Sequence, residues 1–140
     1  SEDDDWSDIF SKVLTARIEP RLGLDRPVIL YEYPVCEAAL ARVSPRDARV
    51  AERFELYACG VELANGFGEL TDPLQQRARF EAELAMKEII YGLRYPLDEE
   101  LLAALATMPP AGGVALGFDR LVMLVTGAPN VDAVLWTPSA

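Results

Sequence analysis

Hydrophobic residues near the start of the chain recur with the spacing of an α-helix. From Asp5 to Ile18 they stand three to four positions apart, as on one face of a helix. They are Trp6, Ile9, Phe10, Val13, Leu14 and Ile18. Pro20 and Gly23 follow and end the pattern, so we expect an amphipathic helix over 5–18.

Three segments that follow are rich in the β-branched and aromatic residues typical of strands. Residues 28–33 (VILYEY) are bounded by prolines, and the segments 53–58 and 61–67 meet at Cys59-Gly60. A two-residue turn with glycine second favours a β-hairpin. The pattern therefore predicts one separate strand and one hairpin.

The second half of the chain is expected to be mainly helical. Asp72 followed by Pro73 is a typical helix start, and Gly92 is a typical stop, which predicts a helix over 72–91. Further elements expected are a short helix over 98–106, a buried strand over 112–118 and a buried helix over 119–126. Hairpin strands with helices between them predict an α+β fold, an antiparallel β-sheet flanked by helices.

Charge and composition restrict the chemistry. The 140 residues include 13 Lys and Arg, 23 Asp and Glu and no histidine, a net charge of −10. Without histidine there is no Ser-His-Asp or Cys-His nucleophile system and no His-ligated zinc. Catalysis must use carboxylates, Arg or Lys, backbone groups or a metal bound through oxygen. The acidic balance also argues against autonomous nucleic-acid binding.

The length suits one domain of about 100–150 residues. Acids are concentrated at the N-terminus, so we expect a disordered acidic head over 1–5 and a folded domain over 6–140. No apolar run approaches the roughly 18 residues of a membrane-spanning helix, and no signal-peptide pattern is found. These features indicate a cytoplasmic protein.

The hairpin carries the first candidate site. Pairing around its two-residue turn places Glu55 opposite Ala64 and on the face of Glu62, where two carboxylates repel unless a cation lies between them. Mg²⁺ is often bound by one or two carboxylates together with phosphates. A second cluster, on the other face by this count, consists of Asn65, Phe67 and Glu69. Joining the clusters requires a bulge or twist near 64–66. The alternative is a solvated acidic face.

The second candidate site is the glycine-rich segment GGVALGFDRLVML, residues 112–124. Glycines between a strand and a helix let a ligand approach the backbone, and the guanidinium of Arg120 matches phosphate. The glycine spacing differs from those of the Walker A and Rossmann motifs. The alternative is an ordinary helix start in which Asp119 pairs with Arg120.

Together, in this order, the two segments resemble the C-terminal half of a class II aminoacyl-tRNA synthetase catalytic domain of the lysyl type. GGVALGFDRLVML is similar to motif 3, and FELYACGVELANGFGELTD to the lysyl-specific hairpin before it. The resemblance extends from about Trp6 to Trp136. It is stronger to the short paralogues that join a lysine-type amino acid to elongation factor P, because VAERFELY, GVELANGFGELTD and GVALGFDRLVML all match them.

The resemblance implies ATP and Mg²⁺ as cofactors and adenylate formation as the reaction. Glu55 and Glu62 would hold Mg²⁺ on the ATP phosphates, and Leu63 would adjoin the nucleotide. Arg120 would lie along the ATP, and Gly117 would let the nucleotide pack on the backbone. Arg120 and Glu62 would therefore be the catalytic residues. The amino-acid pocket would consist of Asn65, Phe67, Ala115 and Glu69, the last pairing with a substrate ammonium.

One departure from the synthetases concerns the substrate. Lysyl-tRNA synthetases usually have glycine where this chain has Ala115. The extra methyl group would disfavour the usual pose of an α-amino acid, and a change of this size is worth about 1–3 kcal/mol of discrimination. Of lysine and β-lysine, we therefore expect β-lysine as the substrate.

A second departure concerns completeness. Nothing resembles motif 1, the dimer element of this homodimeric family, or motif 2, whose FRxE segment supplies an arginine to the α-phosphate. We therefore expect the isolated chain to be inactive or barely active. No anticodon-binding OB-fold region is found either, so elongation factor P is the expected acceptor and tRNA is not. The alternatives are a fragment of a lysyl-tRNA synthetase, a non-catalytic interaction or regulatory module, and an acidic metal-binding module.

Overall fold

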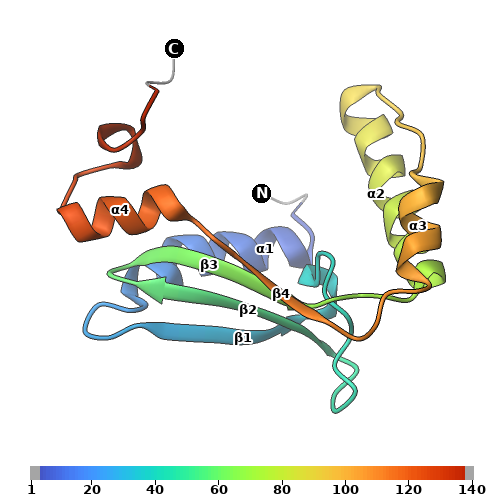
Figure 1. Cartoon of the computed structure of the whole chain (residues 1–140), viewed down its shortest axis with the longest axis horizontal. Helices are drawn as coiled ribbons and strands as arrows, with labels where there is room; N and C mark the ends of the chain where they lie inside the picture. The colour runs from blue at the N-terminus through green and yellow to red at the C-terminus, as the bar shows by residue number, and fades with distance from the viewer. Residues whose placement is uncertain (1–3, 138–140) are drawn as a thin grey trace.

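The computed structural model describes residues 4–137, which form an antiparallel sheet with helices around it. The strands are β1 (Val28–Pro34), β2 (Val50–Ala58), β3 (Val61–Gly68) and β4 (Gly112–Leu116). They lie in the order β1-β2-β3-β4, each antiparallel to the next (Figure 1). The predicted α+β fold with an antiparallel sheet is thereby confirmed.

The N-terminal helix is present and begins with a capping box. Helix α1 (Trp6–Val13) is capped by Asp5, whose carboxylate accepts from the backbone N–H of Asp8 at 2.9 Å. The Asp8 carboxylate in turn accepts from the backbone N–H of Asp5. The chain continues as a π-helical turn over Leu14–Ile18 and a 3₁₀ turn over Glu19–Arg21, so the helical segment predicted over 5–18 is confirmed.

The expected acidic head falls largely outside this description. Residues 1–3 lie outside the described residues. The carboxylate of Asp4 accepts from the ammonium of Lys12 at 2.6 Å, and Asp5 is the helix cap. These two acids are thus bonded to α1.

Helices α2 (Pro73–Tyr91) and α3 (Glu99–Leu105) begin and end as predicted. The carboxylate of Asp72 accepts from the first free backbone N–H groups of α2, and Gly92 ends this helix with φ +65°. Asp98 caps α3. Local residue chemistry therefore sets these helix ends.

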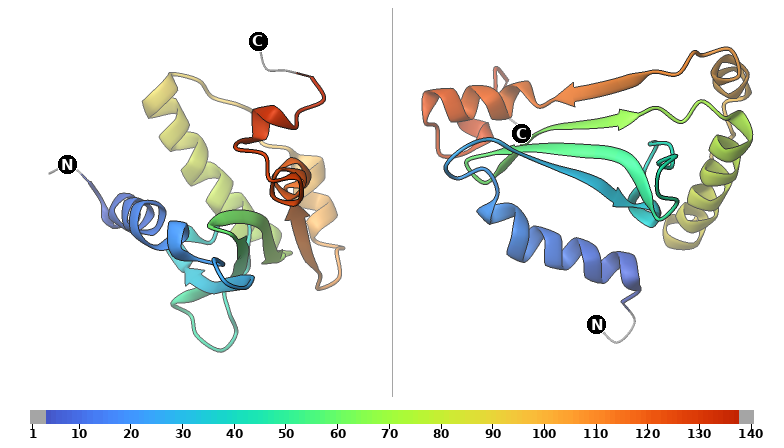
Figure 2. Two further views of the ribbon diagram at one scale, coloured as in Figure 1. Left: turned by 90° about the vertical axis from the view of Figure 1, so that its left-hand side faces the viewer. Right: turned by 90° about the horizontal axis from the view of Figure 1, so that it is seen from below.

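The helices that follow β3 lie at opposite ends of the sheet. Figures 1 and 2 show α2 and α3 side by side at one end and α4 (Phe118–Thr126) at the other. Arg77 of α2 forms an ion pair with Glu99 of α3. Arg79 donates to the carbonyl oxygens of Ala39 and Ala41, at 2.8 and 2.7 Å, which fixes the foot of α2. The region around α4 is therefore free of α2 and α3.

The predicted burial of β4 and α4 is wrong. All five residues of β4 are exposed, and α4 contains no buried residue. Strand β4 lies at an edge of the sheet, and among the described strands it pairs with β3 alone. Apolar composition indicates a tendency to be buried, but burial also needs a neighbouring element. None of the described helices is long and apolar enough to cross a membrane.

One cluster of core residues lies at the end of the sheet near α2. Three alanines, Ala38, Ala41 and Ala51, are almost fully buried, and Phe67 packs against them. Other buried apolar residues, Leu63 and Ala64 among them, lie nearer the hairpin turn. The buried apolar residues therefore extend along the sheet.

A bulge in β3 changes the register of the hairpin. Beside the turn, Tyr57 pairs with Glu62, as a two-residue connection requires. Two residues further along β2, Glu55 pairs with Asn65. Strand β3 has therefore gained one residue, Leu63, relative to β2.

This bulge corrects the predicted pairing. Glu55 lies opposite Asn65 and not opposite Ala64. The extra residue, Leu63, immediately precedes the expected range 64–66. A one-residue slip moves every later side chain to the other face of a strand. Beyond the bulge, Asn65 and Phe67 thus share a face with Glu55, and the residues between them lie on the other face.

A second irregularity, between β1 and β2, brings a tyrosine to the same face. Tyr31 pairs with Phe54 but Tyr33 pairs with Ala51, so β2 advances three residues while β1 advances two. The intervening Glu32 has φ +60°, in the left-handed region. Beyond it the side chain of Tyr33 lies on the face that carries Glu55.

Candidate functional site

The register gathers both predicted clusters on one face of the sheet. Directly opposed residues of antiparallel strands share a face. One row across β2, β3 and β4 is Arg53, Phe67 and Gly113, and the next is Glu55, Asn65 and Ala115. The clusters that simple alternation assigns to opposite faces therefore form one candidate site.

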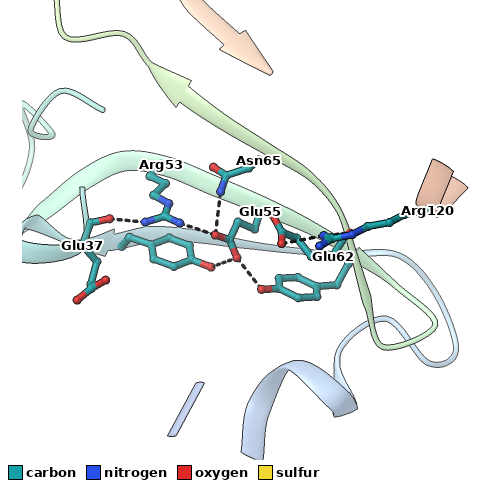
Figure 3. A network of polar contacts seen from close by, with 8 residues as sticks. Glu37, Arg53, Glu55, Glu62, Asn65 and Arg120 are labelled. Atoms are coloured by element: carbon teal, nitrogen blue, oxygen red, sulfur yellow. Dashed lines mark hydrogen bonds and ion pairs between the residues drawn. The ribbon is translucent and has the colours of Figure 1, made fainter. Parts of the chain in front are cut away.

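Glu55 is the centre of a polar network on this face (Figure 3). It is only 6% exposed. Its Oε1 accepts from Nη2 of Arg53 at 2.6 Å and from Nδ2 of Asn65 at 3.0 Å. Its Oε2 accepts from the hydroxyls of Tyr33 and Tyr57 at 2.5 and 2.6 Å. A carboxylate offers about four lone-pair positions, and these donors fill them all.

Arg53 neutralises the buried carboxylate. Besides donating to Glu55, it donates through Nη1 to the carbonyl oxygen of Glu37 at 2.5 Å. Its guanidinium also lies 4.5 Å from the centre of the Tyr33 ring, a cation–π contact. A buried charge is tolerated when it is paired and hydrogen-bonded. The arginine therefore allows an acid to be buried at this position.

The two tyrosines are held in their neutral, donating form. Burial raises the pKa of the Tyr33 hydroxyl well above its usual value of 10, and the neighbouring Glu55 carboxylate raises it further. The same two causes, in the same order, raise the pKa of Tyr57. Both hydroxyls therefore remain donors to Glu55 throughout the neutral pH range.

Asn65 is only partly satisfied by these contacts. Its Nδ2 donates to Glu55, but its Oδ1 is buried and has no hydrogen-bond partner within the described part of the chain. Nearly all buried polar atoms in proteins are paired, so an exception calls for an explanation. A ligand that donates a hydrogen bond would supply the partner.

Glu69 reaches the same face from the end of β3. A Cβ built on Gly113 would lie 2.7 Å from Oε1 of Glu69, so the carboxylate lies directly over the backbone of β4 at a residue without a side chain. Among the described ion pairs, Glu55 is bound to Arg53 and Glu62 to Arg120, whereas Glu69 has no cation partner. It is therefore the acid on this face whose charge a ligand would balance.

Arg120 joins α4 to the hairpin. Its Nη1 donates to the carbonyl oxygen of Glu62 at 2.9 Å and to Oε2 of the same residue at 3.1 Å. The described ion pairs thus place Arg120 on Glu62, and not on Asp119 as in the alternative of an ordinary helix start. Its side chain is 47% exposed, which leaves the rest of the guanidinium accessible to a ligand.

Gly117 lies where β4 ends and α4 begins. Its N–H donates to the carbonyl oxygen of Leu63, the bulged residue, at 2.8 Å. A Cβ at this position would lie 3.3 Å from Cδ of Arg120, which is tighter than an ordinary contact. A small residue here therefore allows the bulge and the arginine to lie close together.

The carboxylates of this face offer few free ligands to a metal ion. Within 4–137, no group of three or more His, Cys, Asp or Glu residues could hold a metal ion. The Glu62 side chain is 32% exposed and can offer an oxygen. Glu55 would have to release one of its four donors before it could bind the ion directly.

A separate groove of about 770 Å³ lies between α2, α3 and residues 35–40. The residues described as lining it include none of the predicted site residues. We therefore place the candidate site on the sheet face and not in this groove.

Sequence reasoning missed three members of the network. Arg53 and Tyr57 flank Glu55 at alternate positions of one strand, a period-two signal that places all three on one face. Tyr33 carries no such signal, because its place depends on the pairing of β1 with β2 and on the backbone at Glu32.

Comparison with known proteins gives a consistent result. Residues 15–140 match the family profile of tRNA synthetases class II (D, K and N). The chain is 48% identical over 135 residues to an elongation factor P–(R)-β-lysine ligase of Klebsiella pneumoniae (strain 342), covering 95% of this chain and 41% of the relative. It is 45% identical over 138 residues to the ligase of the same name from Vibrio cholerae, covering 97% of this chain and 42% of the relative.

The chain spans about two fifths of the length of the curated relatives that it matches. The family match covers most of the chain and includes every residue of the sheet face described above. This protein chain belongs to the class II tRNA synthetase family of the D, K and N type.

Proposed function

We propose that the chain carries the ATP and amino-acid sites of an enzyme that activates a lysine-type amino acid and ligates it to elongation factor P. One observation carries the proposal: Glu62, Asn65, Glu69 and Arg120 converge on a single sheet face through the bulge at Leu63. The names of the relatives, elongation factor P–(R)-β-lysine ligases, support the substrate and the acceptor.

In this proposal the amino acid binds beside β4. Glu69 pairs with a substrate ammonium, because it is an acid on this face without a cation partner among the described ion pairs. Phe67 lies one row from Asn65 and packs against the aliphatic part of the substrate. Ala115 lies opposite Asn65, and its methyl group favours β-lysine over α-lysine.

The nucleotide binds where the bulge meets the start of α4. Arg120 lies along the phosphates, and Gly117 and Leu63 let the nucleotide approach the backbone. Glu62 holds Mg²⁺ on the phosphates, and Glu55 is a second ligand if one of its donors leaves. Bound Mg²⁺ would neutralise charge on the phosphate oxygens. Positioning and charge then drive adenylation, which needs no histidine.

The acceptor is proposed to be a protein. The net charge of −10 disfavours tRNA binding, because proteins bind nucleic acids largely by neutralising phosphates with Lys and Arg. We also propose that the 140 residues bind both substrates but do not complete adenylation alone, because nothing in them resembles the motif 2 arginine.

Calorimetry tests the proposal directly. Wild-type chain should bind Mg-ATP, and then (R)-β-lysine more tightly than α-lysine. Arg120→Ala should lower the affinity for the nucleotide by at least about tenfold. Glu69→Gln should lower the affinity for the amino acid by a similar factor. Mass spectrometry of elongation factor P incubated with the chain, β-lysine and Mg-ATP should show no transfer by the chain alone.

Other outcomes would support the alternatives. A folded chain that binds neither Mg-ATP nor an amino acid would indicate a non-catalytic interaction module. Binding of Mg²⁺ alone, without a nucleotide, would indicate a metal-binding module. A preference for α-lysine over (R)-β-lysine would favour a lysyl-tRNA synthetase fragment.

A further inference from the structure

We propose that Glu55 is a positioning residue that fixes the side-chain amide of Asn65 for the amino-acid substrate, and that Arg53, Tyr33 and Tyr57 hold Glu55 in place. The proposal rests on the proposed function for the identity of the ligand. This role is additional to the metal contact that Glu55 would make if one of its donors leaves.

The first step is the direction of the hydrogen bond between the two residues. An ionised carboxylate only accepts, whereas an amide has a donating and an accepting end. Asn65 must therefore turn its NH₂ group toward Glu55, and it does so with Nδ2 3.0 Å from Oε1 (Figure 3). Glu55 thus selects one of the two possible orientations of the amide.

The second step is the rigidity of Glu55. Its four donors come from three strands, with Tyr33 on β1, Arg53 and Tyr57 on β2 and Asn65 on β3. Arg53 is itself held by the carbonyl oxygen of Glu37 and by the Tyr33 ring. A carboxylate with all its lone pairs bonded has no alternative position that keeps these contacts.

The third step is what remains free on Asn65. With one N–H committed to Glu55, the amide keeps one N–H and an Oδ1 that has no partner in the described part of the chain. These are one donor and one acceptor in fixed directions. An amino acid carries both an acceptor and a donor, in its carboxylate and its ammonium, so it can satisfy the two ends.

The fourth step is charge. Arg53 offsets the charge of Glu55, so Glu55 does not compete with Glu69 for a substrate ammonium. Exchanging Asn65 for aspartate would instead place two carboxylates together, and like charges at this distance repel. A neutral amide with one defined orientation is therefore the group that this position accommodates.

Nuclear magnetic resonance can observe the amide of Asn65 itself. The chain has asparagine only at positions 65 and 130 and glutamine only at 75 and 76, so the spectrum contains four side-chain NH₂ groups. In the ligand-free chain, one Nδ2 proton of Asn65 should shift downfield. It should exchange with water at least about tenfold more slowly than those of Asn130.

Three variants test whether Glu55 is responsible. Glu55→Gln and Tyr57→Phe should speed exchange of the Asn65 amide by about tenfold or more and remove the downfield shift. Tyr31→Phe is the matched control, because Tyr31 is 65% exposed and makes none of these contacts. An unchanged Asn65 signal in folded Glu55→Gln overturns the proposal. If that variant does not fold, an unchanged signal in Tyr57→Phe overturns it instead.

Ligand binding separates positioning from metal ligation. Positioning predicts that Tyr57→Phe, which keeps the carboxylate of Glu55, weakens the binding of (R)-β-lysine by about tenfold and leaves Mg-ATP affinity within about twofold. The opposite result, lost Mg-ATP affinity with unchanged amino-acid affinity, overturns the proposal. If the wild-type chain binds no amino acid, the proposed function fails, whereas the exchange measurement still decides whether Glu55 orients Asn65.

Discussion

Asn65 and Glu55 lie directly opposite each other on β3 and β2, with the amide nitrogen of one 3.0 Å from the carboxylate of the other. Counting back from the hairpin turn assigns them to opposite faces. They meet because Leu63 is an extra residue in β3, between the turn and Asn65. This one residue brings the proposed nucleotide and amino-acid contacts to the same face of the sheet.

The hydroxyl of Tyr57 should contribute measurably to stability. It is 1% exposed and donates to the buried carboxylate of Glu55, so Tyr57→Phe leaves that carboxylate short of one donor. We expect the free energy of unfolding in urea to fall by about 1–3 kcal/mol. The matched control, Tyr95→Phe at a residue 56% exposed, should change it by less than about 0.5 kcal/mol. Equal changes in the two variants would contradict the network.

Gly113 should control the position of Glu69. An added methyl group would lie 2.7 Å from the Glu69 carboxylate and displace it, so Gly113→Ala should weaken (R)-β-lysine binding by about tenfold. Gly112→Ala is the control, since its methyl group meets a backbone carbonyl of Phe67 at 3.3 Å instead. Calorimetry of the two variants should separate them, and a larger loss in Gly112→Ala would argue against this role.

Ala115 should set the choice between lysine isomers. It lies opposite Asn65 on the neighbouring strand, where its methyl group occupies space beside the proposed substrate. Ala115→Gly should shift preference toward α-lysine by about 1–3 kcal/mol, as measured by competition between the two isomers. An unaltered ratio of affinities would place the origin of selectivity elsewhere.

The pair between Arg120 and Glu62 should matter for the ligand and not for the fold. Its side chains are 47% and 32% exposed, so solvent screens the interaction and Arg120→Ala should cost less than about 1 kcal/mol of stability. Mg-ATP affinity should fall by at least about tenfold. Arg49→Ala, which removes an exposed pair with Asp47, should leave nucleotide affinity unchanged. Equal losses of affinity would indicate a general charge effect.

Alkaline solution should destabilise the fold through Tyr33 and Tyr57. Burial raises the pKa of both hydroxyls in the folded chain above the usual value of 10. Their contribution is therefore complete below pH 10 and is lost as the pH rises above it, because the unfolded chain ionises first. Alkaline unfolding, followed by the absorbance of tyrosinate, should show this loss of stability. In the Tyr33→Phe/Tyr57→Phe variant, the loss of stability between neutral and alkaline pH should be smaller than in the wild-type chain.

Much of the fold was predictable because it depends on local chemistry. Helix α2 begins where Asp72 accepts from free backbone N–H groups and Pro73 takes the first helical position. It ends where Gly92 adopts the left-handed conformation. Cys59 and Gly60 form the hairpin turn with positive φ angles. These effects involve neighbours in sequence, so they are visible without the tertiary structure.

Most residues of the candidate site could be predicted from the sequence, but their arrangement on one face of the sheet could not. Glu55, Glu62, Asn65 and Glu69 stand out as polar residues in a strand-like segment, yet alternation alone separates them. Register is a property of two strands, and an extra residue at position 63 is recognisable only once both are paired. The contact of Tyr33 with Glu55 is also recognisable only from strand pairing, because the two residues are 22 positions apart on different strands.

By itself the sequence determined the elements, their caps, the turn and the absence of histidine chemistry, because each of these follows from residue type and short-range spacing. The tertiary structure alone decided that β4 and α4 are exposed, that Arg53 and two tyrosines surround Glu55, and that Asn65 faces it. Burial, register and partnership depend on which segments lie side by side, and that is settled by packing and pairing across the whole sheet.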